Sequence, residues 1–395
     1  MDFTFTEEQR MIADSAKEVA KDFPPEYWRE KDTKEEHADE FYKAVARAGF
    51  TGTLIPQEFG GAGEGMTEMC IAIEEMAANG CGMAAVWYLV VSEVVPGLIM
   101  VRSGTEEQKK KYLPRIVAGD EFCFALTEPD AGSNSLNTKT RATKVDNGWV
   151  INGGKTWITE ADKAIGMLIV TRTTPKEKAP KKTFGISLFL TDLPNPAITI
   201  SPLPKHGIRY SKSFDVGIDD LKLSEDALVP PQDEGWYSLL YGLDPERMVF
   251  TAAAIGIARI AISKAVEYTK GRKVFGDEPI GKYQGLQFNL AEAYIGIEAA
   301  KLLNFKSTIL YDNGASFREF GPISNMAKYV ATDSGIKAVE RAMTCFGGLG
   351  YAVDTDVERW WREINLLRLA PFTQQLGLAY VGEHVLGMPR SYAST

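Results

Sequence analysis

Apolar residues in the first third of the chain recur at the spacing of a helix. Thr6–Gln9 has the capping-box pattern that opens a helix. Ile12, Ala16 and Val19 then follow at intervals of three and four residues, which places them on one helical face. We therefore expect a helical region over residues 1–120.

From residue 121 to 235 the pattern changes to short β-rich runs. Phe184–Leu190 and Ser213–Ile218 are two of them, and turn signals such as Asp146–Gly148 separate such runs. No long helical stripe intervenes. This part of the chain predicts a small antiparallel barrel or sandwich.

Long helical stripes return after residue 236. The expected helices are Met248–Tyr268, Gly285–Tyr311, Ile323–Phe346 and Phe372–Leu386. Four helices of this length predict a bundle. The expected fold class is therefore α+β and mostly α, with an N-terminal helical domain (1–120), a β-barrel domain (121–235) and a C-terminal four-helix bundle (236–395).

The composition fits an ordinary soluble protein, since 45% of the 395 residues are apolar and 25% are charged. The net charge of −9 disfavours a nucleic-acid surface, which needs a basic stripe. The four cysteines show no CxxC spacing and the three histidines no ligand spacing. We therefore expect no disulfide framework and no metal site.

We expect a cytoplasmic protein. Met1–Arg10 is polar and acidic, unlike a signal peptide. The longest apolar run, Ala84–Val101, is broken by Glu93 and Pro96, so no membrane span is expected. Scattered cysteines fit a reducing compartment.

One segment of the β region has the groups that a flat, polar-edged aromatic ring requires. Within Phe124–Ser133, Thr127 and Ser133 offer hydroxyls, and a Pro/Gly turn exposes backbone N–H groups. Further along, Trp157 can cover the face of a flavin, and Thr159 can bond near the ring nitrogen that accepts hydride. The alternative for either half alone is an ordinary hairpin with a packed tryptophan.

Motifs in a fixed order along the whole chain point to one family. They are Phe5–Gln9, Ile55–Gly61, Gly104–Leu113, Phe124–Ser133 with Trp157 and Thr159, Arg272–Gly276 and Phe346–Tyr351. In these motifs the chain resembles the FAD-dependent acyl-CoA dehydrogenase family. The resemblance implies bound FAD, an acyl-CoA substrate, an electron-transfer flavoprotein as acceptor, and a homotetramer that shares FAD sites between subunits.

The resemblance also implies which residues bind FAD. Arg272, Phe275 and Gln284 match positions that hold the diphosphate and adenosine, commonly of a neighbouring subunit, and a guanidinium suits a phosphate. Asp277–Pro279 lengthens the loop before Gln284 relative to the family. The expected set is Phe124, Leu126, Thr127, Gly132, Ser133, Trp157, Thr159, Arg272, Phe275, Gln284, Gly347, Gly348, Thr373 and Gln375.

The implied reaction needs a carboxylate base, because the α-proton of a thioester is too weakly acidic to leave unaided. Many family members carry this base just before the last helix, where the present chain has Pro371. In a subgroup that includes isovaleryl- and long-chain-type enzymes, the glutamate instead precedes an arginine, as Glu246 precedes Arg247 here. We therefore expect Glu246 to be the base. The structural alternative is an acidic residue in the first turn of a helix, which the helix dipole favours.

Three residues are expected near the CoA part of the substrate. By resemblance, Ser133 lies near the pantetheine arm, and Asp244 and Arg247 lie near the CoA moiety. A helix N-cap is the structural alternative for Asp244.

The resemblance to the family implies that the segment Trp87–Pro96 lines the end of the acyl pocket. Tyr88, Val91 and Val95 have the spacing of one helical face, which is also typical of plain core. As a pocket end, the large Trp87 and Tyr88 would limit depth. Val91 adds no charge, which disfavours a dicarboxylyl substrate and favours a branched, cyclic or medium-length acyl group.

The leading prediction is an enzyme that converts an acyl-CoA into a trans-2-enoyl-CoA, with the α-proton taken by the base and the β-hydride by FAD. The same fold could serve an enoyl-CoA reductase or an acyl-CoA oxidase. A second alternative, suggested by Pro371, is a non-catalytic acyl-CoA- or flavin-binding relative. Glu246 argues against it.

Overall fold

The N-terminal part of the chain is helical in the computed structural model, which describes residues 4–391. The first helix begins where the capping box predicts, because the Thr6 hydroxyl accepts from the Gln9 amide at 3.1 Å. The helices are α1 (Glu7–Lys21), α2 (Pro25–Lys34), α3 (Asp39–Arg47), α4 (Met66–Met76), α5 (Ala84–Leu89), α6 (Leu98–Ser103) and α7 (Glu106–Val117).

A π-helical segment, Val90–Gly97, joins α5 to α6. Its wider turns change the angle between successive side chains from that of an α-helix.

The middle part of the chain forms a mixed sheet in the order β6-β7-β3-β2-β4-β5-β8. The predicted antiparallel pairing holds for most neighbours, but β1 pairs with β4 in parallel. The strands are β1 (Cys123–Ala125), β2 (Arg141–Val145), β3 (Gly148–Thr159), β4 (Gly166–Arg172), β5 (Ile186–Asp192), β6 (Ile198–Pro202), β7 (Ser213–Leu223) and β8 (Leu228–Val229).

Alternate residues of β4 enter two different cores. Leu168 and Val170 belong to the main core shared with the helices. Met167 and Ile169 belong to a second core within the sheet domain. Burial of both faces explains why this strand is continuously apolar.

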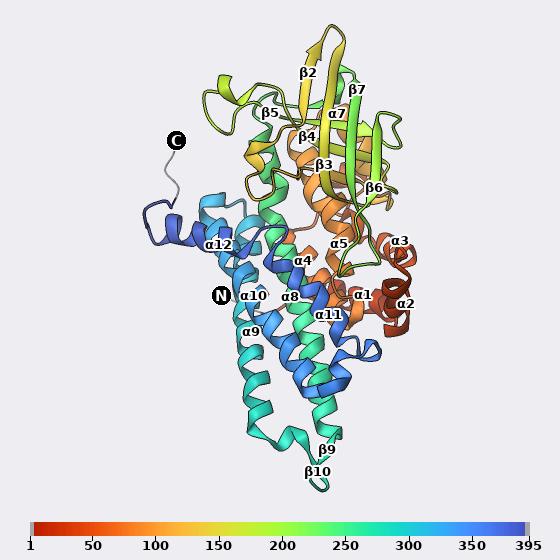
Figure 1. Cartoon of the computed structure of the whole chain (residues 1–395), viewed down its shortest axis with the longest axis vertical. Helices are drawn as coiled ribbons and strands as arrows, with labels where there is room; N and C mark the ends of the chain where they lie inside the picture. The colour runs from red at the N-terminus through yellow and green to blue at the C-terminus, as the bar shows by residue number, and fades with distance from the viewer. Residues whose placement is uncertain (1–3, 392–395) are drawn as a thin grey trace.

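Three long helices dominate the C-terminal part of the described chain and run lengthwise below the sheet (Figure 1). The fold class predicted from the sequence is confirmed, although α8 begins earlier than expected and α11 was not predicted; α12 continues as a π-helical segment, Val381–Val385, close to the predicted end. The elements are α8 (Gly235–Gly271), the hairpin β9 (Lys273–Val274) and β10 (Glu278–Pro279), α9 (Gln284–Asp312), α10 (Phe317–Phe346), α11 (Val357–Asn365) and α12 (Gln374–Tyr380).

Two helical stretches, Ala84–Ser103 and Gly235–Gly271, are long and apolar enough to cross a membrane by composition. Most of each apolar stretch, 83% and 72%, is buried against the rest of the protein. This burial is what core helices of a globular fold show, so their composition is weak evidence for a span.

Candidate active site

Glu246 lies in the interior of α8, eleven residues after the helix begins at Gly235. The dipole of a helix acts mainly on its first and last turns. The structural alternative for Glu246, an acidic residue in a first turn, is therefore wrong. Asp244 is likewise inside the helix, so it is no N-cap; it is buried and pairs with Arg247 at 2.9 Å.

The Glu246 carboxyl is half-buried, and no residue between positions 4 and 391 gives it a hydrogen bond or an ion pair. Burial raises its pKa to about 8, against the opposing charges of Arg247 and Lys328. A buried acid without a partner costs stability, so structural needs do not explain it. A carboxyl with a pKa raised in this way is typical of a group that transfers a proton.

Lys328 on α10 binds the segment between α11 and α12. Its ammonium donates to the carbonyls of Leu367 and Phe372, the latter at 2.7 Å. The Arg247 guanidinium lies 4.3 Å from the centroid of the Phe372 ring. Pro371 directly precedes Phe372 and Glu246 directly precedes Arg247, so the two sequence positions considered for the base lie next to this contact.

The predicted flavin platform is built from β1 and β3. The Thr156 amide donates to the Thr127 carbonyl at 2.9 Å, which joins the two halves of the motif. A break in the β3–β7 register between Lys155 and Ile158 turns Trp157 outward, with φ of 61° and 56% of its surface exposed. Thr159, two residues on, is buried. An exposed indole face beside a recessed hydroxyl fits the cover and edge contacts that a flavin ring needs.

A buried ion pair shapes the loop that carries Gly132 and Ser133, both exposed. The Glu128 carboxylate accepts from the Lys155 ammonium at 2.8 Å and from the Thr140 amide at 2.9 Å. Burial alone would raise the pKa of Glu128, but Lys155 and the neighbouring donors hold it at about 2. Sequence reasoning missed this pair, because nothing local marks Glu128 as the partner of a lysine on another strand.

Packing connects the platform to the helix that carries the base. β1 contacts the π-helical segment Val90–Gly97, and that segment contacts α8. At the second contact a Cβ on Gly242 would lie 2.7 Å from the Val95 carbonyl oxygen, so glycine is needed there. Gly242 is one helical turn before Glu246.

The residues expected to line the acyl pocket differ in burial. Tyr88 and Val95 are buried, and the Tyr88 hydroxyl donates to the Tyr210 carbonyl at 3.0 Å. Between residues 82 and 100, partial exposure is kept by Trp87 and Val91. Val91 therefore differs from Tyr88 and Val95 in exposure, and it shares its partial exposure with Trp87, four residues before it. Substrate contact by Tyr88 and Val95 stays a prediction.

The residues expected to hold the FAD diphosphate and adenosine lie at the opposite end of the molecule. Arg272, Phe275 and Gln284 are exposed around the β9–β10 hairpin, at the lower end of Figure 1, away from the sheet. Phe346 stacks on Tyr268 with ring centroids 4.4 Å apart, which brings the following Gly347 and Gly348 to the same end.

The two expected adenine-side residues lie elsewhere, at α12. Thr373 caps this helix by accepting from the Leu376 amide at 3.2 Å, and Gln375 is exposed. Within one chain, the platform lies on elements that are packed towards the helix with Glu246. The other residues expected to bind FAD lie apart from the platform.

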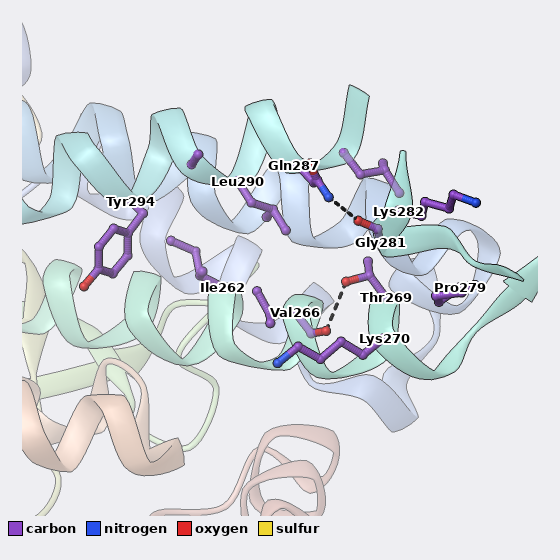
Figure 2. Close-up of a pocket in the computed structure, with 12 residues that line it drawn as sticks. Ile262, Val266, Thr269, Lys270, Pro279, Gly281, Lys282, Gln287, Leu290 and Tyr294 are labelled. Atoms are coloured by element: carbon purple, nitrogen blue, oxygen red, sulfur yellow. Dashed lines mark hydrogen bonds between the residues drawn. The ribbon is translucent and has the colours of Figure 1, made fainter. Parts of the chain in front are cut away.

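A cavity of about 670 Å³ lies between α8, α9 and the turn after β10 (Figure 2). Its walls are mainly apolar, with Ile262, Val266 and Leu290 facing one another, and no carboxylate lines it. The cavity therefore lacks the base that the reaction needs. It lies beside the hairpin with Arg272, away from Glu246.

Comparisons with known proteins cover the whole described fold. The N-terminal, middle and C-terminal domain families of acyl-CoA dehydrogenases match residues 6–120, 123–221 and 233–386. The acyl-CoA dehydrogenase FadE12 of Mycobacterium tuberculosis is 37% identical over 391 residues, 99% of each chain. A 3-(aryl)acrylate reductase of Clostridium sporogenes is 30% identical over 97% of this chain and 99% of its own.

The solved structure of butyryl-CoA dehydrogenase from Megasphaera elsdenii superposes with a TM-score of 0.92, at 28% identity over 98% of this chain and 100% of that chain. Enzymes of this family bind FAD, and the exposed Trp157 face fits that cofactor. Domain matches, relatives and fold agree, and this chain belongs to the acyl-CoA dehydrogenase family.

Proposed function

We propose that the protein oxidises an acyl-CoA thioester to a trans-2-enoyl-CoA with Glu246 as the general base. The observation that carries this proposal is the unpaired, half-buried carboxyl of Glu246, located where the neighbouring Pro371 segment lacks a carboxylate. The family membership supports the reaction class.

In this mechanism the chain's own residues position the thioester and move one proton. The Glu246 carboxylate takes the α-proton of the substrate onto a carboxyl oxygen. Arg247 and Lys328 stabilise the ionised carboxylate before it reacts. Trp157 covers one face of the flavin ring. Bound FAD supplies the acceptor for the β-hydrogen.

Glu246→Gln tests the assignment. The amide keeps the shape of the side chain but cannot accept the proton, so turnover should fall about 10²- to 10⁴-fold. The variant should keep its yellow colour, because Glu246 is not a cofactor contact. The measurement is anaerobic bleaching of the flavin by acyl-CoA thioesters. Glu267→Gln, on the exposed end of α8, is the control and should bleach like the wild type. Near-normal bleaching by Glu246→Gln would remove Glu246 as the base.

Catalysis towards reduction is the second candidate, and two observations favour it. The relative from Clostridium sporogenes is described as a reductase. With its pKa raised to about 8, Glu246 also carries a proton at neutral pH, which an enoyl reductase must deliver to the α-carbon. Initial rates in both directions, with one dye couple as acceptor and donor, separate the two. An oxidation rate that rises with dissolved oxygen would instead indicate an oxidase. If oxygen does not raise the rate, we propose that an electron-transfer flavoprotein is the acceptor.

We propose further that the active protein is a homotetramer whose FAD sites use residues from two subunits. The platform with Trp157 and the hairpin residues with Arg272 lie at opposite ends of one chain. The expected FAD-binding residues of a single chain therefore cannot all contact the same FAD. The exposed face of α9 carries apolar residues at seven-residue intervals, which a solitary chain would leave in water. They are Phe288, Ile295, Leu302 and Ile309, with 63%, 68%, 52% and 46% of their surfaces exposed.

A further inference from the structure

An ammonium group beside the Trp87 ring is buried without a hydrogen-bond or ion-pair partner among the described residues. The Nζ atom of Lys205 lies 5.8 Å from the centroid of the Trp87 ring. It is sealed from solvent and makes no hydrogen bond or ion pair with any residue from 4 to 391. Burial lowers the pKa of Lys205 to about 8, with Glu160 opposing the shift. The position of this cation therefore needs an explanation.

The nearest carboxylates are committed to other groups. Glu160 pairs with the His37 ring at 2.7 Å and accepts from the Lys212 amide at 3.2 Å. His37 also pairs with Asp162 at 3.0 Å, and despite burial these carboxylates raise its pKa to about 9. A charged His37 offsets one of these two carboxylates. Glu160 acts on the Lys205 charge from a distance, but no carboxylate of the described residues forms an ion pair with Lys205.

Trp87 adds a second donor at the same place. Its indole Nε1–H is buried and has no acceptor among the described residues. Neither an ammonium nor an indole N–H can accept a hydrogen bond. The two groups together lack an acceptor, and because one is a cation, a carboxylate would match them best.

A series of contacts leads from Glu246 to the Trp87 and Lys205 donors. Phe250 is four residues after Glu246, which is one turn or about 6 Å along the helix. The Trp87 ring meets the Phe250 ring edge to face, with centroids 5.9 Å apart. Trp87 and Val91 are also the residues of their helix that keep partial exposure. The order from Glu246 through Phe250 and Trp87 to Lys205 matches an acyl chain that leads away from its α-carbon.

We propose that Lys205 and Trp87 bind a carboxylate at the far end of the acyl group, so that the substrate is a dicarboxylyl-CoA thioester of short to medium length. This inference rests on the proposed function and names its substrate class. It reverses the sequence-based expectation drawn from the uncharged Val91, because the charge comes from a loop of the middle domain instead of the pocket helix.

The test compares thioesters that differ only in the terminal group. Butyryl- and succinyl-CoA, pentanoyl- and glutaryl-CoA, and hexanoyl- and adipoyl-CoA are titrated anaerobically into the FAD-loaded protein. In at least one pair the dicarboxylyl member should bleach the flavin with a kcat/KM about tenfold or more above its partner, as one charge-assisted contact supplies. Lys205→Met should lower that ratio at least about tenfold, and Trp87→Phe should lower it less.

Binding is measured separately from turnover. Calorimetric titration of Glu246→Gln with the same thioesters should show the same preference, which Lys205→Met in that background abolishes. Lys178→Met, at an exposed lysine of the same domain, is the matched control and should leave the preference in place.

Two outcomes would overturn the carboxylate site. One is a wild-type protein that favours the monocarboxylyl member of every pair. The other is a Lys205→Met variant in which kcat/KM falls equally for both thioesters of a pair, since this would assign Lys205 a structural role. If no thioester bleaches the flavin, the proposed dehydrogenation is wrong, and the calorimetry still decides the carboxylate site.

Discussion

At the scale of single residues, the charge state of Glu246 sets the pH at which the enzyme can work. Its pKa is raised to about 8 by burial and lowered in part by Arg247 and Lys328. A base must be ionised to accept a proton, so kcat/KM for oxidation should rise with pH and level off above about 8.

Replacing Lys328 tests this electrostatic balance. Lys328→Met removes a positive charge that favours the carboxylate, so the rising limb of the pH profile should move to higher pH. Lys328 also holds the carbonyls of Leu367 and Phe372. Loss of that purely structural role would lower the rate at every pH without moving the limb. A profile that keeps its midpoint would therefore show that the Lys328 charge does not act on the base.

The residue scale also shows what local sequence can reveal. The motif around Glu246 and the proline at position 371 suffice to propose Glu246 as the base by resemblance. The unpaired carboxyl and its raised pKa depend on packing against α10, which no local pattern encodes. Lys205 was overlooked for the same reason, since its neighbour Trp87 is more than a hundred positions away in sequence.

At the scale of elements, the flavin loop depends on the ion pair between Glu128 and Lys155. Removing one member of a buried pair leaves the other charge without compensation, at a cost of about 3–5 kcal/mol. We expect Lys155→Met to lower the melting temperature and to reduce the FAD content, because the loop with Gly132 and Ser133 loses its anchor. The double variant Glu128→Gln/Lys155→Met should be more stable than Lys155→Met alone.

The pH dependence of this ion pair follows from the direction in which folding shifts the pKa of Glu128. The pKa of Glu128 is depressed to about 2 in the folded protein, below the ordinary value of 4.5. Its contribution to stability is therefore present above pH of about 4.5 and is lost as the pH falls towards 2. Melting curves between pH 7 and pH 3 should lose more stability in the wild type than in the double variant. Equal losses would show that the pair contributes nothing.

Some elements also show where the hydrophobic periodicity of the sequence gives an incomplete prediction. The 3.6-residue pattern located the long helices to within a few turns, because their buried faces are regular. It did not show that Trp87 and Val91 are the residues that keep partial exposure between residues 82 and 100. It also missed the early start of α8, since Pro245 inside the helix reads as a helix start.

At the scale of the whole molecule, the sequence predicts the order of the helical, β and helical parts. It does not predict the distance between the two sets of residues expected to bind FAD, one around Trp157 and one around Arg272. Sequence places Arg272 in the same motif set as Trp157. The structure puts them at opposite ends, because α8 alone spans 37 residues between the sheet and the β9–β10 hairpin (Figure 1).

A mixing experiment tests the shared site that this separation implies. Arg272→Ala should release FAD, and Glu246→Gln should keep FAD without turnover, so each variant alone should be inactive. In a hybrid assembly, the platform and Glu246 of the first variant meet Arg272 of the second, which completes one site. Variants mixed under dissociating conditions and reassembled with FAD should therefore regain activity, up to about a quarter of the wild type for random pairing. Light scattering confirms the assembly. A mixture without activity, despite hybrid assemblies resolved by mass, would place all FAD contacts of each site within one chain and remove the proposed sharing.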